Sequence, residues 1–151
     1  MSLPIKFADT SRLTRAIFVV ALIGTLEAAY LTYIHYHGLG GLPCLGGHHG
    51  QSTCAAVQSS AYAKVAGVPV ALLGLLSYVT IVASLFFRGE LGRGAGFCVA
   101  LIGFGFSMYL TYRELFTLKE ICEWCVGSAT LMTILAVLTA IRFLRGEPAP
   151  A

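Results

Sequence analysis

Four long stretches of apolar residues constrain this chain more than any other feature, and they cover residues 16–36, 65–87, 95–112 and 124–141. A helix that crosses a membrane needs about 20 mostly apolar residues, and in lipid the backbone must satisfy its own hydrogen bonds. Barrel strands would instead alternate over about 10 residues. The sequence therefore predicts an all-α membrane protein, a four-helix bundle whose outer loop carries a short helix. We expect the helices at about residues 14–37, 65–87, 94–116 and 122–144.

Composition supports a membrane protein and excludes several other classes. Of the 151 residues, 57% are apolar and 11% are charged, whereas about a quarter of an ordinary soluble domain is charged. Disordered chains are poor in apolar residues, so disorder is excluded. The net charge is +3 without a basic cluster, so no nucleic-acid binding is expected. We expect one integral membrane domain over residues 1–151, with the first apolar stretch retained as a helix.

The basic residues predict an orientation in the bilayer. Seven of the ten Lys and Arg fall on one side of the predicted spans: Lys6, Arg12, Arg15, Arg88, Arg93, Arg142 and Arg145. The richer side is expected to be cytoplasmic. The prediction is a multi-pass protein of the inner (plasma) membrane with both termini cytoplasmic. The 37–64 loop and the 113–122 turn then face the periplasm or the extracellular space.

Four of the five cysteines gather on the predicted outer side: Cys44, Cys54, Cys122 and Cys125. Disulfides persist in that compartment. Cys122 and Cys125 form a Cys-x-x-Cys pair at the start of a helix, where the helix dipole and free N–H groups lower a thiol pKa. Such a pair suits thiol–disulfide exchange. Cys98 lies far from the others and is expected to be a small buried apolar residue.

Other readings of the same cysteines remain open. Two structural disulfides would suit an outer loop, and His48 and His49 could complete a zinc site with two cysteines. The spacing of Cys44 and Cys54 is not that of a zinc knuckle, so no metal site is expected. The alternative function is soft-metal binding or transport, for example of mercuric ion. A transporter should hold a thiol pair inside a span, whereas only Cys98 lies there.

Three segments resemble the bacterial homologues of vitamin K epoxide reductase. They are Cys54-Ala-Ala-Val-Gln-Ser-Ser60, Gly67-Val-Pro69 with Gly74 and Tyr78, and Cys122-Glu-Trp-Cys125. The resemblance covers about residues 12–145, without a fused thioredoxin-like domain. It implies a quinone-dependent thiol-disulfide oxidoreductase of the membrane that supports disulfide formation.

The resemblance also implies a role for each matching residue. Cys122 and Cys125 would be the active-site pair, with Cys125 nearest the quinone. Cys44 and Cys54 would be the shuttle pair: Cys54 exchanges with Cys122, and Cys44 meets a separate periplasmic thioredoxin-like (DsbA-like) partner. Ser60 would bind the quinone, although its position alone favours an ordinary helix cap. The acceptor would be menaquinone, ubiquinone or a vitamin K-like quinone.

Two departures from the animal enzymes bear on the substrate. The chain contains no asparagine, and Ala129 stands where those enzymes carry a tyrosine. The animal enzymes use an asparagine to bind the vitamin K oxygen. The resemblance therefore favours plain quinone reduction over epoxide reduction.

Glu27 and an internal repeat stand apart from these motifs. A carboxyl group within a span is costly, so Glu27 is expected either to be neutral and bonded to a nearby hydroxyl or carbonyl, or to relay protons. Residues 21–37 resemble residues 100–116 at a constant offset of 79. This offset predicts a parallel two-fold repeat, with Gly24 and Gly103 allowing close helix approach.

Overall fold

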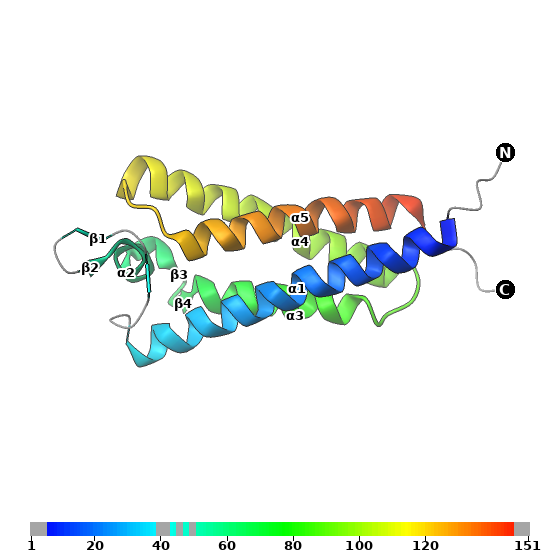
Figure 1. Cartoon of the computed structure of the whole chain (residues 1–151), viewed down its shortest axis with the longest axis horizontal. Helices are drawn as coiled ribbons and strands as arrows, with labels where there is room; N and C mark the ends of the chain where they lie inside the picture. The colour runs from blue at the N-terminus through cyan, green and yellow to red at the C-terminus, as the bar shows by residue number, and fades with distance from the viewer. Residues whose placement is uncertain (1–5, 39–42, 45–46, 49–50, 147–151) are drawn as a thin grey trace.

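Four long helices lie side by side and define the fold (Figure 1). The structure is a computed structural model, and it describes residues 6–38, 43–44, 47–48 and 51–146. The long helices are α1 (Lys6–His37), α3 (Val70–Ser84), α4 (Glu90–Arg113) and α5 (Glu123–Arg145). The predicted all-α architecture is confirmed.

Helix length sets how many of these elements can cross a bilayer by themselves. Among the described residues, three stretches are long and apolar enough: Thr10–His37, Glu90–Leu118 and Glu123–Arg145. Helix α3 has 15 residues, or roughly 22 Å at 1.5 Å per residue, against about 30 Å of hydrocarbon. The chain is a multi-pass membrane protein, and a fourth crossing by α3 stays a prediction.

The sequence predicted a helix over residues 65–87, but α3 begins five residues later and ends three residues earlier. The first residues instead form a hairpin in which β3 (Lys64–Val65) pairs with β4 (Val68–Pro69). The two turn residues, Ala66 and Gly67, have φ of 52° and 83°, as a tight two-residue hairpin turn requires. Pro69 then caps α3. The turn at Ala66 and Gly67 therefore makes this segment a hairpin, although its residues are mostly apolar.

The outer loop forms a small cap at one end of the bundle (Figure 1). It contains β1 (Gly47–His48) paired with β2 (Gln51–Ser52), then α2 (Thr53–Ser59) and the short 3-10 turn η2 (Ala61–Ala63). The predicted short helix is α2. Beyond α4, the wider turn η3 (Glu114–Leu118) ends at Lys119, which has a left-handed φ of 53°. The first residues of α1 and the last of α5 lie at the opposite end.

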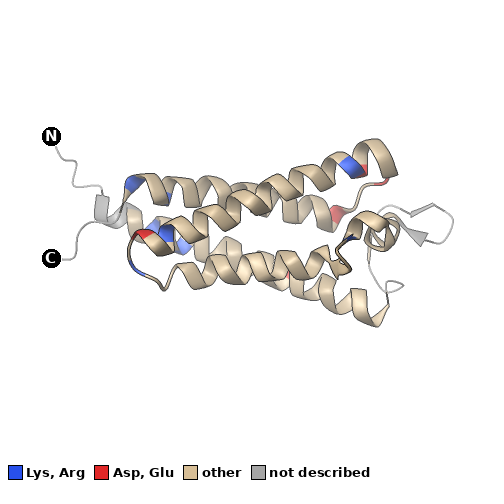
Figure 2. Cartoon of the chain, turned by 180° about the vertical axis from the view of Figure 1, so that it is seen from behind, with Lys and Arg blue, Asp and Glu red and all other residues tan. Residues whose placement is uncertain are grey.

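Basic residues are more numerous at one end of the bundle than at the other (Figure 2). The end that holds the start of α1 and the end of α5 carries most of the described arginines: Arg12, Arg15, Arg88, Arg93, Arg142 and Arg145. The cap end carries Lys64, Arg113 and Lys119. The middle of the bundle is almost free of colour in Figure 2, as a lipid-crossing region requires.

Two glycines allow close helix packing, as predicted. A Cβ atom on Gly24 of α1 would overlap the ring of Tyr78 on α3, and one on Gly103 of α4 would lie 2.8 Å from the sulfur of Met132 on α5. Each glycine therefore admits a large side chain from the next long helix along the chain. Tyr78 and Met132 both belong to the apolar core, so the two halves of the predicted repeat pack in the same manner.

We expect Gly24→Ala to destabilise the protein by about 1–3 kcal/mol, because the added methyl group has no space beside the buried Tyr78 ring. Thermal unfolding in detergent would measure the loss. The matched control is Gly105→Ala in α4, where an added Cβ meets nothing within 4 Å. Equal melting temperatures for the two variants would contradict this packing.

Candidate active site

The structure brings the four outer cysteines together at the cap end. Cys44 and Cys54 form a disulfide with a Cα–Cα distance of 6.2 Å. Cys54 and Cys122 are completely buried, and both belong to one apolar cluster against which Cys44 and Cys125 pack. The Cys44–Cys54 disulfide thus lies next to the Cys-x-x-Cys pair, although Cys54 and Cys122 are 68 positions apart in the sequence.

Local structure explains how the two pairs meet. Cys54 lies in the first turn of α2, while Cys122 caps α5 and Cys125 lies in the first turn of that helix. The Trp124 indole N–H donates a hydrogen bond to the Pro43 carbonyl oxygen at 3.0 Å. The Tyr30 ring packs on the indole with 5.3 Å between ring centroids. Trp124 therefore ties the segment before Cys44 to the start of α5.

Hydrogen bonds make Cys122 the more acidic thiol of its pair. The Cys125 thiol donates a hydrogen bond to the Cys122 sulfur and lowers the pKa of Cys122 below its ordinary 9.0. Burial opposes this shift, while the backbone N–H groups of Cys125 and Trp124 add to it. The predicted direction is confirmed for Cys122. Its largest cause is the neighbouring thiol rather than the helix dipole.

A pH titration should show this acidity. In a variant that keeps only Cys122 and Cys125, the thiolate absorbance of the folded protein should rise at lower pH than that of the unfolded chain. The reason is that a lowered pKa moves deprotonation toward acid. Further substitution of Cys125→Ala removes the donor and should move the midpoint back toward 9.0. An unchanged midpoint would contradict the proposed hydrogen bond.

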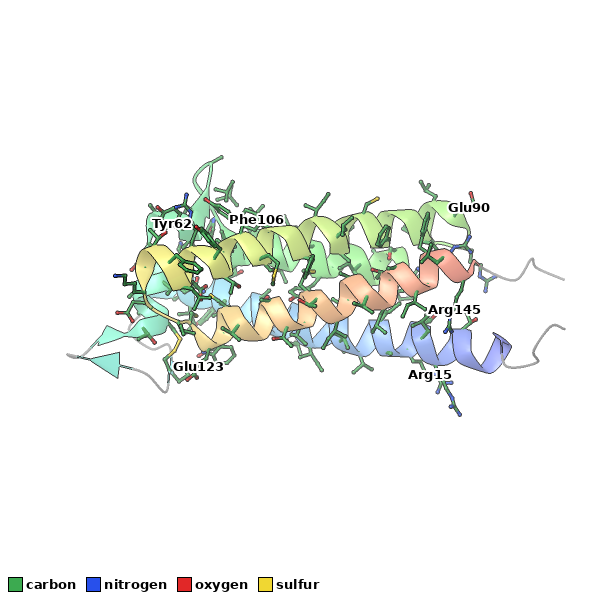
Figure 3. The ribbon with its side chains drawn as sticks, turned by 90° about the horizontal axis from the view of Figure 1, so that it is seen from above. Arg15, Tyr62, Glu90, Phe106, Glu123 and Arg145 are labelled. Atoms are coloured by element: carbon green, nitrogen blue, oxygen red, sulfur yellow. A yellow bond between two sulfur atoms is a disulfide. The ribbon has the colours of Figure 1, made fainter. Side chains whose placement is uncertain are left out.

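A cavity of about 450 Å³ lies between α3, α4 and the cap, and Cys125 is part of its wall. Its side walls are largely apolar, with Leu73, Leu76, Ile102, Phe106, Leu110 and Met132 among them. Polar residues gather at the cap end: Gln58, Ser60, Tyr62, Arg113 and Glu114. Figure 3 shows Tyr62 and Phe106 at this end of the bundle, far from Arg145. A flat apolar molecule with polar oxygens fits such a cavity in size and chemistry.

Ser60 lies at the end of α2 and beside the cavity. It lines the cavity, but its hydroxyl also donates a hydrogen bond to the Val57 carbonyl oxygen at 2.7 Å, at the end of α2. Ser60 occupies the N-cap position of η2 but makes no side-chain cap hydrogen bond there; its hydroxyl bonds back to α2 instead. Quinone binding by Ser60 stays a prediction, since its donor hydrogen is already used.

Two residues that the sequence analysis did not single out contact the reactive thiols. The Gln58 amide Nε2 lies 3.5 Å from the Cys125 sulfur. The Glu114 carboxyl accepts a hydrogen bond from the Cys122 backbone N–H at 3.4 Å, and it is hydrogen-bonded to the Cys125 thiol. Gln58 could have been suspected, because it follows Cys54 by four residues on one helix. No spacing rule marks Glu114, because an irregular turn separates it from Cys122.

Arginine 113 links the cap to α4. Its guanidinium carbon lies 4.7 Å from the centroid of the Tyr62 ring, and its Nε donates to the Tyr109 hydroxyl at 3.2 Å. A cation over an aromatic ring is attracted by its negative face. Arg113 thus helps to hold η2 over the cavity.

Cys98 and Glu27 both lie within predicted membrane spans. Cys98 was expected to be buried, but it is exposed on α4; a helix that is apolar all round does not reveal which face turns inward. Glu27 faces the bundle interior: a Cβ on Gly127 would lie 3.1 Å from its Oε1. Nearby, the Tyr78 hydroxyl bonds to the Ser128 carbonyl and hydroxyl oxygens at 3.1 and 2.9 Å. The relay role of Glu27 stays a prediction.

The alternative zinc site falls partly outside the described residues. His49 and the side chain of His48 lie outside the described part of the chain. Among the residues that the structure does describe, no group of three or more His, Cys, Asp or Glu side chains is placed to hold a metal.

A helical bundle with a disulfide, a Cys-x-x-Cys pair and an adjoining apolar cavity defines a membrane thiol oxidoreductase. The sequence matches the model of the vitamin K epoxide reductase family over residues 15–140. The chain therefore belongs to this family, and the predicted resemblance is confirmed. Members are multi-pass membrane thiol oxidoreductases with redox cysteines, and the family uses quinones.

Proposed function

We propose that the protein transfers electrons from a periplasmic thioredoxin-like dithiol to a quinone and so supports disulfide formation. The observation that carries this proposal is the position of Cys125, which packs against the apolar cluster that contains Cys54 and Cys122 and also lines the cavity. A thiol at that position can receive electrons from one side and pass them on to the other.

The proposed route uses the four cysteines in order. A partner thiolate attacks Cys44 of the Cys44–Cys54 disulfide, and a second partner thiol releases the partner as a disulfide. Cys54 then attacks Cys122 and Cys125 leaves as a thiolate, after which Cys44 attacks Cys54, restores the Cys44–Cys54 disulfide and releases Cys122. Finally, the Cys122 and Cys125 thiols close their disulfide as a quinone in the cavity becomes a hydroquinone. Each cycle moves two electrons and two protons, so no further reductant is needed.

The charge distribution supports an orientation for this route. The arginine-rich end would lie in the cytoplasm, because short cytoplasmic segments are enriched in Lys and Arg. The cap and its cysteines would then face the periplasm or the exterior, where disulfides persist. Both termini would be cytoplasmic, with α3 as a fourth, short crossing.

The acceptor would be menaquinone, ubiquinone or a vitamin K-like quinone. Leu73, Leu76 and Ile102 offer an apolar wall to such a ring system, and the cap end offers polar groups to its oxygens. Ala129 is a buried methyl side chain of α5, so it supplies no hydroxyl to an epoxide oxygen. Plain quinone reduction makes fewer demands on hydrogen bonding.

Quinone reduction by the purified protein tests this proposal. Wild-type protein in detergent would receive a reduced DsbA-like protein as donor, and the loss of quinone absorbance would be followed. We expect turnover that depends on both donor and quinone. Absence of turnover, together with tight binding of mercuric or zinc ion by the reduced protein, would instead favour the soft-metal alternative.

A further inference from the structure

Glu114 occupies an unusual position for a carboxyl group. It is the first residue of η3, it is only 4% exposed, and it lines the cavity. Its Oε2 accepts the Cys122 backbone N–H at 3.4 Å, and its carboxyl is also hydrogen-bonded to the Cys125 thiol, whose single hydrogen is shared between this carboxyl and the Cys122 sulfur. One side chain therefore contacts both members of the reactive pair and the space beside them.

A purely structural role explains little of this arrangement. Any neutral acceptor could satisfy the Cys122 N–H, and a buried carboxyl costs free energy that such an acceptor would not. The Gln58 amide Nε2 lies 3.5 Å from the Cys125 sulfur, so a neutral side chain already contacts that thiol. A carboxyl group can both accept and donate a proton. It can therefore take up the hydrogen that the Cys125 thiol loses when the disulfide forms.

We propose that Glu114 is a catalytic residue that carries the Cys125 proton to the reduced quinone. This inference rests on the proposed function. As the disulfide forms, the two sulfurs lose two electrons, the Cys125 S–H bond breaks, and its proton passes to a Glu114 oxygen. The same oxygen then releases that proton to a quinone oxygen in the cavity and returns to the carboxylate.

The second proton balances the one that Cys122 lost earlier. Because Cys122 reacts as a thiolate, its proton has already passed to water on the outer side. One proton from that side therefore completes the hydroquinone, so two thiols and one quinone give one disulfide and one hydroquinone. Among the described titratable groups, the thiols of Cys122 and Cys125 interact with Glu114, and Arg113 and Tyr62 line the same cavity.

The test compares Glu114→Gln, Glu114→Asp and wild type. Glutamine keeps an oxygen acceptor for the Cys122 N–H but cannot carry a proton, whereas aspartate still can. In single-turnover experiments the reduced protein would be mixed with quinone. We expect Glu114→Gln to slow quinone reduction by about 100-fold or more, the usual size of a general acid–base contribution. Aspartate should recover much of this loss.

Two further measurements separate catalysis from folding. Reduction of the Cys44–Cys54 disulfide by the partner dithiol, without quinone, should be unchanged in Glu114→Gln. Glu123→Gln is the charge-matched control, because this exposed carboxyl next to Cys122 points away from the bundle (Figure 3) and should behave like wild type.

The outcomes separate this inference from the proposal on which it rests. If wild type reduces quinone and Glu114→Gln does so within about threefold of it, the proton carrier is wrong while the oxidoreductase stands. If both half-reactions slow together, Glu114 has a structural role only. If wild type reduces no quinone, the proposed function itself fails.

Discussion

Substitution of Cys125→Ala should abolish quinone reduction with every thiol donor. Among the described residues, Cys125 is the one cysteine that lines the cavity, so none of their other thiols can pass electrons directly to a molecule held there. We expect turnover to fall by about 10⁴-fold or more, as when a reacting nucleophile is removed from an enzyme. Quinone consumption with both a protein donor and a small dithiol measures the effect.

The disulfides of the Cys125→Ala variant provide a second measurement. With Cys125 absent, Cys122 cannot close its usual disulfide, so a mixed disulfide between Cys54 and Cys122 should accumulate. Cys98→Ala is the control for cysteine loss, because Cys98 is exposed on α4 and belongs to neither thiol pair. Residual turnover by Cys125→Ala above a few per cent of wild type would rule out the proposed path through the cavity wall.

Substitution of Cys44→Ala should separate two kinds of donor. Turnover with a reduced DsbA-like protein should fall by about 100-fold or more, since the partner loses the disulfide that it attacks. Turnover with a small dithiol should persist, because such a donor needs no docking surface and the loop is no longer tied to α2 at Cys54. The ratio of the two rates is the quantity to compare with wild type.

Cys54→Ala is the matched variant for this test. It removes the same disulfide but leaves Cys44 free, so a partner with one active cysteine should form a stable mixed disulfide with Cys44. Cys44→Ala should form none. The reverse pattern, with the partner trapped on Cys54, would reverse the order of the relay.

The Cys-x-x-Cys pair and the contact between Gln58 and Cys125 differ in how far the sequence could predict them. Cys122 and Cys125 are close because one helical turn separates them, and the start of α5 follows from the apolar stretch. The Gln58 amide and the Cys125 sulfur are 67 residues apart along the chain. Their contact depends on how the cap folds over the end of α5, which no local pattern encodes.

The sequence pattern also could not predict which face of each helix is buried. In water, a polar face shows which side of a helix turns outward; in lipid both sides are apolar. For this reason the exposure of Cys98 was mispredicted. The short α3 was missed because residues 65–69 are as apolar as a helix, while the turn at Ala66 and Gly67 starts a hairpin.

By itself, the sequence determined the membrane class, the approximate helices, the charge asymmetry and the family, since length and composition control insertion in lipid. Only the tertiary structure decided which groups surround Cys125. A cavity is enclosed by packing between elements distant in sequence, and Glu114 reaches Cys122 and Cys125 only because the irregular turn at Lys119 folds the chain back. The chemistry proposed for this carboxyl therefore follows from packing rather than from a motif.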